Sequence, residues 1–298
     1  MADSTKTYRG NCHCGAYVYE VKAATPENLK VSECNCSSCY KKGIVYARYE
    51  TKDINFIKGD PSTLTDYTFG SKKWHHKFCP NCGNQLFIEG YLEPPQPGET
   101  KEPVRAVNVR SFQHGQGVDV WKMEKNLING QSFGTPYEPP KYTGPEPKAV
   151  EGGKLYTGSC HCGAVKVAMN TLPLDKNSTQ NCRECNCSIC NKQGAVWIYP
   201  KLEQVEIEGE ENLTTYLFGS KMFGKTFCRT CGIPVHNSVQ PIAKEMLNEM
   251  PEEKRAFMED VMTKKAINLR LINGVDVKDL NVEHYDGYNL IKPGYVEP

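Results

Sequence analysis

The stretch Cys12-His13-Cys14-Gly15 is the first of three cysteine motifs, and it is followed by Cys34-Asn35-Cys36-Ser37-Ser38-Cys39 and by Phe78-Cys79-Pro80-Asn81-Cys82-Gly83. Each motif holds its thiols one or two residues apart, which is the spacing of metal-binding loops. The motifs supply two, three and two thiols. Seven thiols are enough for one closed site of four thiolates and one open site of three. Closed zinc sites are structural, whereas catalytic zinc keeps a position open.

The same three motifs occur a second time in the same order. They read Cys160-His161-Cys162-Gly163, Cys185-Asn186-Cys187-Ser188-Ile189-Cys190 and Phe227-Cys228-Arg229-Thr230-Cys231-Gly232. Cys182 alone has no counterpart in the other copy. A twofold repeat of this length indicates a duplicated domain rather than a solenoid.

A disulfide framework is the alternative use of so many cysteines. Such frameworks are typical of small secreted domains, whereas this chain has 298 residues and a polar start without an apolar signal core. No apolar run approaches the length of a membrane span. We therefore expect a cytoplasmic protein whose thiols bind zinc.

The charge balance argues against polyanionic partners. The formal net charge is +1, and 39% hydrophobic with 24% charged residues is typical of a globular chain. A neutral chain has no general attraction to nucleic acid or to anionic membranes. We expect neither as a partner.

The repeat predicts a first zinc domain over residues 1–130, a linker over 131–153 and a second zinc domain over 154–298. The linker contains five prolines and four glycines, which favour an extended segment. Alternating apolar residues such as Val165, Val167 and Met169 predict that both domains are mainly β. Residues 241–263 predict two short helices inserted in the second domain, the second beginning near Pro251, as a surface elaboration or a lid. The duplication also favours an internal pseudo-dimer.

Spacing alone does not establish which motifs share a metal ion. The first two motifs could pair with each other as readily as the first with the third. His13 and His161, the histidines common to both copies, each lie between two thiols, so we expect their side chains to point away from the metal. A fourth protein ligand for the three-thiol motif is the alternative to an open site. His75 and His76 are the nearby candidates, but the second copy has Gly224 and Lys225 at these positions.

The three-thiol motif predicts a particular chemistry. Zinc with three thiolates carries one net negative charge and is poorly suited to making hydroxide, but its soft ligands suit an incoming thiol as the fourth ligand. Coordination deprotonates that thiol. The pattern therefore favours thiolate addition to, or release from, an electrophilic carbon.

The complete pattern, C-x-C-G, C-x-C-S-x-C, a glycine and F-C-x-x-C-G, resembles the glutathione-dependent formaldehyde-activating enzyme family, which includes centromere protein V. Gly43 and the segment ending at Arg110, with its counterpart at Arg270, extend the likeness. The resemblance implies a β-rich, tent-like fold with about two zinc ions per domain. It also implies which thiols form the structural sites: Cys12, Cys14, Cys79 and Cys82, and Cys160, Cys162, Cys228 and Cys231. The open, catalytic sites would then be formed by Cys34, Cys36 and Cys39, and by Cys185, Cys187 and Cys190.

The family reaction joins glutathione and formaldehyde, formally as a carbon–sulfur lyase. We therefore expect a lyase acting on thiol adducts of an aldehyde or similar electrophile, with glutathione as substrate or co-substrate. A non-catalytic zinc scaffold is the alternative. Tyr40 and Asn191 replace a frequent family arginine, and Asn35 and Asn186 replace a frequent histidine, so the adduct could be larger. Cations repeated in both copies are candidates for the glutathione carboxylates: Lys42 and Lys192 (which is offset by one place, since Gln193 aligns with Lys42), Lys72 and Lys221, Arg110 and Arg270. The alternatives are solvated surface charges for the lysines and structural ion pairs for the arginines.

Overall fold

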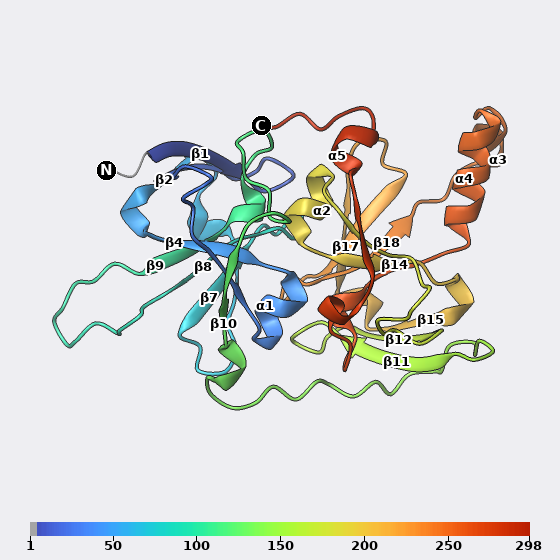
Figure 1. The fold of residues 1–298 in the computed structure, drawn as a ribbon, viewed down its shortest axis with the longest axis horizontal. Coiled ribbons are helices and arrows are strands. Elements are labelled where there is room, and N and C mark those ends of the chain that lie inside the picture. Colours follow the sequence, from blue (N-terminus) through green and yellow to red (C-terminus); the bar gives the residue numbers. More distant parts are fainter. Residues whose placement is uncertain (1–4) are drawn as a thin grey trace. The chain divides into compact units, whose positions relative to one another are not determined.

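Strands dominate the computed structural model, which describes residues 5–298 (Figure 1). Strand β2 (Val18–Ala24) illustrates why these segments form strands. Its buried Val21 and Ala23 alternate with the more exposed Glu20 and Lys22, as in a strand with one face in the core. The mainly β fold predicted from such patterns is confirmed.

The first copy forms two sheets. The smaller has the order β1-β2-β5, with β1 at Thr5–Asn11 and β5 at Ile54–Lys58. The larger has the order β10-β3-β4-β9-β8-β7-β6. Its strands are β3 (Val31–Cys34), β4 (Val45–Glu50), β6 (Thr65–Tyr67), β7 (Trp74–Phe78), β8 (Gln85–Gly90), β9 (Val104–Asn108) and β10 (Lys125–Ile128). All neighbours are antiparallel except β10 and β3, which are parallel.

The second copy repeats both sheets strand for strand. Its smaller sheet is β11-β12-β15, formed by Lys154–Ser159, Lys166–Thr171 and Val205–Glu208. The larger has the order β16-β17-β18-β19-β14-β13-β20, which is the order of the first copy in equivalent strands. Its strands are β13 (Cys182–Cys185), β14 (Val196–Ile198), β16 (Leu213–Leu217), β17 (Phe223–Cys228), β18 (Pro234–Val239), β19 (Ala266–Asn268) and β20 (Val282–Tyr285).

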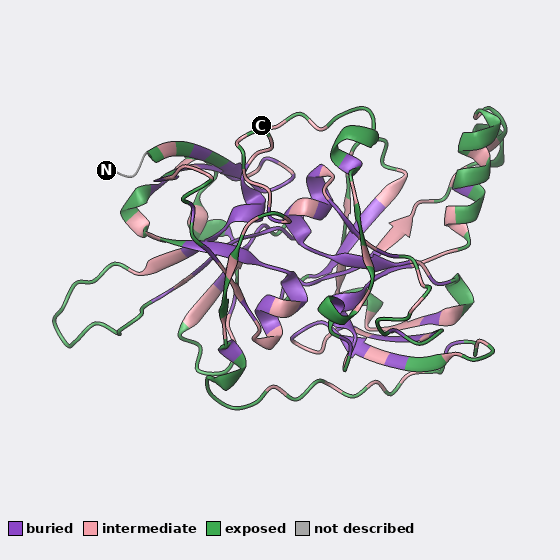
Figure 2. Ribbon diagram, viewed as in Figure 1, coloured by how far each residue is buried: buried purple, intermediate pink, exposed green. Residues whose placement is uncertain are grey.

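The helices are short. Each copy places one six-residue helix after its three-thiol motif, α1 (Ser37–Lys42) and α2 (Ser188–Gln193). The predicted insertion forms α3 (Lys244–Asn248) and α4 (Glu252–Met262), which begins after Pro251 as expected. Figure 2 shows both of these helices as largely exposed. Met258 of α4 is buried. A last helix, α5, spans Gly287–Leu290.

Short 3-10 helices occupy several turns. They are η1 (Thr51–Asp53), η2 (Pro61–Thr63), η3 (Val109–Ser111), η4 (Gly130–Ser132), η5 (Leu202–Gln204), η6 (Glu210–Asn212), η7 (Leu269–Leu271) and η8 (Val277–Asp279). Residues 106–110 and 266–270 alternate in sequence and so predict strands that include Arg110 and Arg270. This prediction is wrong for the two arginines, which lie in 3-10 helices. The cause is Asn108, whose side chain accepts the Arg110 N–H and ends β9, and Asn268 ends β19 in the same way.

The residues group into two units. The first contains the chain up to Tyr137 together with Asn186–Gly194 and Asp286–Pro298, and the second contains Glu138–Cys185 and Ala195–Tyr285. Helix α2 and the last thirteen residues thus pack in the first unit although the repeat assigns them to the second copy. The boundaries at residues 130 and 154 describe the repeat and stay a prediction. No helix in residues 5–298 has the length and apolar character needed to cross a bilayer.

Candidate metal centres

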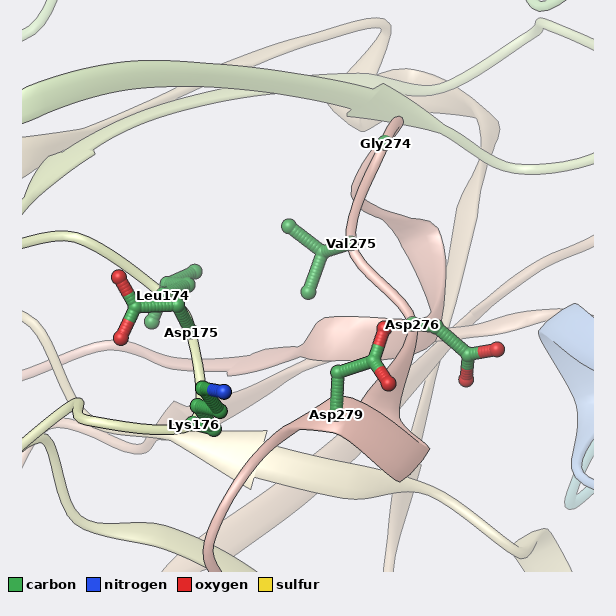
Figure 3. A pocket seen from close by; sticks show the side chains of 7 residues that line it. All are labelled: Leu174, Asp175, Lys176, Gly274, Val275, Asp276 and Asp279. Atoms are coloured by element: carbon green, nitrogen blue, oxygen red, sulfur yellow. The ribbon is translucent and has the colours of Figure 1, made fainter.

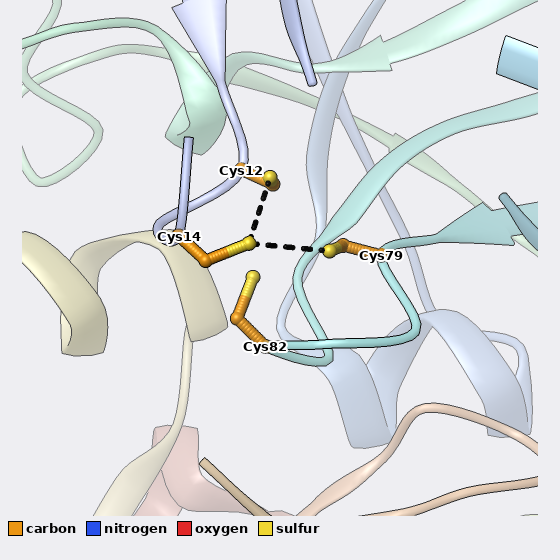
Figure 4. A group of neighbouring side chains, drawn as sticks. All are labelled: Cys12, Cys14, Cys79 and Cys82. Carbon is orange, nitrogen blue, oxygen red and sulfur yellow. Dashed lines mark hydrogen bonds between the residues drawn. The ribbon is translucent and has the colours of Figure 1, made fainter. Parts of the chain in front are cut away.

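The first and third motifs of the first copy bring four sulfurs together (Figure 4). Cys12 and Cys14 lie in the loop between β1 and β2, and Cys79 and Cys82 lie in the loop between β7 and β8. The Sγ atom of Cys14 is 3.5 Å from that of Cys12 and 3.6 Å from that of Cys79. We call these four residues the first closed cluster. It joins the small sheet of the copy to the large one.

The second copy forms an equivalent second closed cluster from Cys160, Cys162, Cys228 and Cys231. The Sγ atom of Cys162 is 3.5 Å from those of Cys160 and Cys228. In both clusters the glycine after each motif has a positive φ, between 68° and 80°, which lets the loop turn sharply next to the thiols: Gly15, Gly83, Gly163 and Gly232.

The geometry fits a zinc ion. Zinc–sulfur bonds of about 2.3 Å in a tetrahedron separate the sulfurs by about 3.8 Å, close to the distances found here. Without a cation the four thiols do not all ionise, because burial raises the pKa values of Cys82 and Cys231 well above the usual range, whereas hydrogen bonding from the Cys12 thiol lowers the pKa of Cys14. Four thiolates this close repel one another unless a cation lies among them.

The middle motifs form two open clusters of three thiols each. The first contains Cys34 at the end of β3, Cys36 just before α1, and Cys39 within α1. The second contains Cys185, Cys187 and Cys190 in the same positions relative to β13 and α2. The sulfurs in each cluster lie within 4.8 Å of one another. Among residues 5–298, no histidine, aspartate, glutamate or further cysteine completes either group at that distance.

The first open cluster favours one thiolate even without a metal. Hydrogen bonding from the Cys36 thiol, aided by backbone N–H groups of Cys36 and Gly130, lowers the pKa of Cys34 to about 3. The same interaction raises the pKa of Cys36 to about 11. The three sulfurs therefore share their protons as a group.

The surroundings of the first open cluster are apolar. Cys34 and Cys39 pack with Tyr46, Ile88 and other buried residues, and partly buried Trp74 and Ile128 lie against them. Burial raises the pKa of Tyr46 to about 12, so its hydroxyl stays protonated at neutral pH. Trp197 occupies the position of Tyr46 in the second copy, so this hydroxyl is not repeated.

A backbone turn packs directly against the first open cluster. A Cβ atom placed on Gly130 would lie 2.4 Å from the Cys34 sulfur, so only glycine fits there. Asn35, between two cluster cysteines, holds this turn: its Nδ2 donates to Asn129 Oδ1 at 3.0 Å, and its Oδ1 accepts the N–H of Gln131 at 3.0 Å.

Asn186 makes the same type of clamp beside the second open cluster. Its Nδ2 donates to Asp286 Oδ1 at 2.9 Å, and its Oδ1 accepts the N–H of Tyr288 at 2.9 Å. The sequence analysis missed this role of Asn35 and Asn186. The signal was present, since an asparagine between the first two thiols is repeated, as is the glycine of Asn129-Gly130 and Asp286-Gly287.

Comparison with known proteins identifies the family. The family model for the glutathione-dependent formaldehyde-activating enzyme matches residues 7–115 and again residues 155–250. The chain belongs to this family. Each match contains all seven thiols of its copy, so the predicted tandem duplication is confirmed as well. A crystal structure of a Rhodobacter sphaeroides protein is 28% identical to the chain, covering 43% of this chain and 98% of its own, with a TM-score of 0.32.

The repeated cations lie in three different environments. Lys42 is buried, donates to Gln85 Oε1 and lies 5.0 Å from the centre of the Phe78 ring. Arg110 is also buried, and its Nε donates to the Gly43 carbonyl at 2.9 Å, which supports the end of α1. Lys192 is fully buried too. Their contacts give these three residues internal roles in packing.

Lys72 and Lys221 are exposed, and their repetition has a backbone cause. Each ends a turn with a left-handed φ, 56° for Lys72 and 59° for Lys221, and each donates its N–H to the phenylalanine three residues earlier. Their ammonium groups face solvent, so they remain available to anionic ligands.

The histidines outside the shared motif are occupied elsewhere. His75 Nδ1 lies 2.7 Å from Asp66 Oδ2, and buried His76 packs against the rings of Tyr67 and Phe69. Neither belongs to a group of potential metal ligands. Cys182 is buried at the start of β13, where burial raises its pKa to about 11, so it is an inert core residue.

A hollow of about 320 Å³ in the second unit has no cysteine in its lining (Figure 3). It is lined by Leu174, Asp175, Lys176, Gly274, Val275, Asp276 and Asp279. Two of its carboxylates stabilise the local turns, because Asp175 accepts the N–H of Asn177 and Asp276 that of Lys278. None of the lining residues belongs to a cysteine cluster.

The four clusters predict about four zinc ions per fully loaded chain, since each closed cluster supplies four ligands and each open cluster three. Elemental analysis of protein purified under reducing conditions measures this number. About two ions would restrict tight binding to the closed clusters, and no zinc at all would contradict the metal assignment.

Proposed function

We propose that the chain is a zinc-dependent carbon–sulfur lyase that forms or cleaves glutathione adducts of an aldehyde or similar electrophile. The closed clusters would be structural, and the open clusters would be the reaction sites. Membership of the glutathione-dependent formaldehyde-activating enzyme family supports this proposal.

The observation that carries the proposal is the ligand number of the open clusters. Three thiols converge in each, and residues 5–298 offer no fourth side chain from the usual ligand types within 4.8 Å of all three. A structural zinc site would use four protein ligands. Three ligands instead suit a site that accepts one from the substrate.

Zinc held by Cys34, Cys36 and Cys39 would supply a coordination position at which an incoming thiol loses its proton. A thiolate activated in this way would add through its sulfur to the carbonyl carbon of the aldehyde, so that a carbon–sulfur bond would form and the carbonyl π bond would become an alkoxide. The alkoxide would take up the proton that the thiol had released. Atoms and charge balance, and the reverse sequence is the lyase reaction.

The side chains around the first open cluster would assist this chemistry in two ways. The apolar wall containing Tyr46, Ile88 and Trp74 limits water at the sulfurs. Tyr46 supplies a phenol to this wall, and its protonated hydroxyl could donate a hydrogen bond to a developing oxyanion. We propose Lys72 and Lys221 as contacts for the glutathione carboxylates, because the other repeated cations make internal contacts.

Titration with glutathione tests the proposal directly. We expect the mean number of sulfur ligands per zinc, measured by X-ray absorption on fully loaded protein, to rise from about 3.5 to about 4. The double variant Cys36→Ser, Cys187→Ser is the control and should show no rise above its own starting value. Exchange of ¹³C-formaldehyde into its glutathione adduct, followed by NMR, should accelerate with wild type only.

The outcomes separate the possible functions. A fourth sulfur ligand on zinc without faster formaldehyde exchange would support thiol binding at the open clusters but indicate an electrophile other than formaldehyde. No fourth sulfur and no exchange would favour the alternative, a zinc-stabilised scaffold.

A further inference from the structure

Helix α2 carries two thiols of the second open cluster, Cys187 and Cys190, yet it packs in the first unit. Its contacts there come from several elements of the first copy. They are Ser188 Oγ to His13 Nε2 at 2.9 Å, Asn191 Nδ2 to the Arg110 carbonyl at 3.3 Å, and Lys192 Nζ to the Ser111 carbonyl at 3.1 Å. The position of α2 therefore depends on residues of the first copy.

His13 is the most constrained of these contacts. It lies between Cys12 and Cys14 of the first closed cluster, and its N–H donates to Asn84 Oδ1 at 2.9 Å. Its buried ring stacks on Tyr295 with 4.4 Å between ring centres, and the Tyr295 hydroxyl donates to the His13 carbonyl at 2.6 Å.

The last residues of the chain reinforce the same contact. Glu297 lies 3.9 Å from the ammonium group of Lys192 on α2, and 3.2 Å from His114 Nδ1. Nε2 of His114 in turn lies 3.2 Å from the carbonyl oxygen of Asn186, next to Cys187. Glu297 thus contacts Lys192 directly and Asn186 through His114, at the two ends of the segment that contains Cys187 and Cys190.

The counterpart of Ser188 in the first copy is Ser37, and the next residue, Ser38, is replaced by Ile189 in the second copy. Ser38 offers a comparison with Ser188 because it also lies between the second and third thiols of its cluster. The hydroxyl of Ser38, between Cys36 and Cys39, is buried and forms no hydrogen bond with any residue that the structure describes. Ser188 and Ser38 are thus both serines between the second and third thiols, and the Ser188 hydroxyl bonds to His13 whereas the Ser38 hydroxyl makes no hydrogen bond among residues 5–298.

We propose that His13 is a positioning residue for the second open cluster, through which the first closed cluster sets the metal affinity of Cys185, Cys187 and Cys190. A metal ion in the first closed cluster would hold the Cys12–Cys14 loop, and the His13–Ser188 hydrogen bond would hold α2 with its two thiols in ligand geometry. The coupling is reciprocal by linkage. This coupling goes beyond the proposed lyase function, and it can be measured by metal binding without any enzymatic assay.

The test compares Ser188→Ala with Ser38→Ala in the full-length chain. Ser188→Ala is measured in a Cys36→Ser background, so that only the second open cluster remains, and Ser38→Ala in a Cys187→Ser background. Competition with a chromogenic chelator gives the zinc affinity, and the thiolate-to-metal absorption of the Co²⁺ form reports the geometry. We expect Ser188→Ala to weaken the second open cluster about tenfold, the lower end of effects for residues that orient ligands. Ser38→Ala should change the first by less than about twofold.

A double-mutant cycle assigns the effect to the contact with His13. His13→Ala and Ser188→Ala should each weaken the second open cluster, and together they should cost no more than either alone. Ser188→Thr, which keeps the hydroxyl, should restore affinity and the Co²⁺ spectrum. Equal effects of Ser188→Ala and Ser38→Ala, additive effects in the cycle, or a chain whose open clusters bind no metal would each overturn the proposal.

Discussion

Cys82→Ser should unfold the part of the first copy where its two sheets meet. The first closed cluster joins the β1–β2 loop to the β7–β8 loop, and three of its four cysteines are fully buried. Binding of structural zinc contributes on the order of 10 kcal/mol to folding, and the net stability of a domain is about 5–15 kcal/mol. Loss of one ligand should therefore remove several kcal/mol, most of that stability.

Hydrogen exchange followed by mass spectrometry measures this effect strand by strand. Protection should fall in β1, β2, β7 and β8 and persist in β11, β12, β17 and β18. Chelation of the wild type should produce the same loss of protection, and added chelator should then change Cys82→Ser little, because the variant already lacks the closed site.

Cys182→Ala is the matched control for this experiment. Cys182 is as buried as the cluster thiols but belongs to no cluster. Its removal deletes one sulfur from the core and should cost about 1 kcal/mol without any dependence on zinc. If Cys182→Ala and Cys82→Ser had similar effects, the closed cluster would contribute only packing.

The sequence was most informative about features that repeat locally. Motif spacing showed that Cys12 and Cys14 lie in one tight loop and that Cys34, Cys36 and Cys39 lie in another, because these distances depend on a few residues of backbone. It did not show which loops meet. The partition into closed and open clusters followed from family resemblance, and the structure brings the same sulfurs together.

The features that sequence patterns missed depend on contacts between distant segments. Arg110 reads as part of an alternating strand, but the side chain of Asn108 competes with the strand for the Arg110 N–H. The turn at Gly130 reaches the Cys34 sulfur from almost one hundred residues away. Periodicity describes one segment at a time, so it cannot report either the partner of Lys42 or the packing of α2 in the first unit.

Cys36→Ser, in contrast to Cys82→Ser, should remove chemistry while preserving the fold. The first open cluster spans only the six residues from Cys34 to Cys39, so its metal closes little chain and should contribute less to folding. A metal that activates a substrate is worth several kcal/mol in the transition state, so turnover at this cluster should fall about a hundredfold or more. Hydrogen exchange in β1, β2, β7 and β8 should stay as in wild type.

Cys187→Ser makes the same change in the second copy, and the set of variants apportions the activity between the two. If both open clusters react independently, each single variant keeps the activity of the other cluster, and the double variant loses nearly all glutathione-dependent exchange. If one cluster does the chemistry, one single variant is as inactive as the double. If Cys36→Ser unfolded its copy while Cys82→Ser remained folded but inactive, the two kinds of cluster would have exchanged roles. If the double variant kept full activity, neither open cluster would be catalytic, because a zinc ion that has lost one of three thiolates cannot hold and deprotonate a substrate thiol in the same geometry.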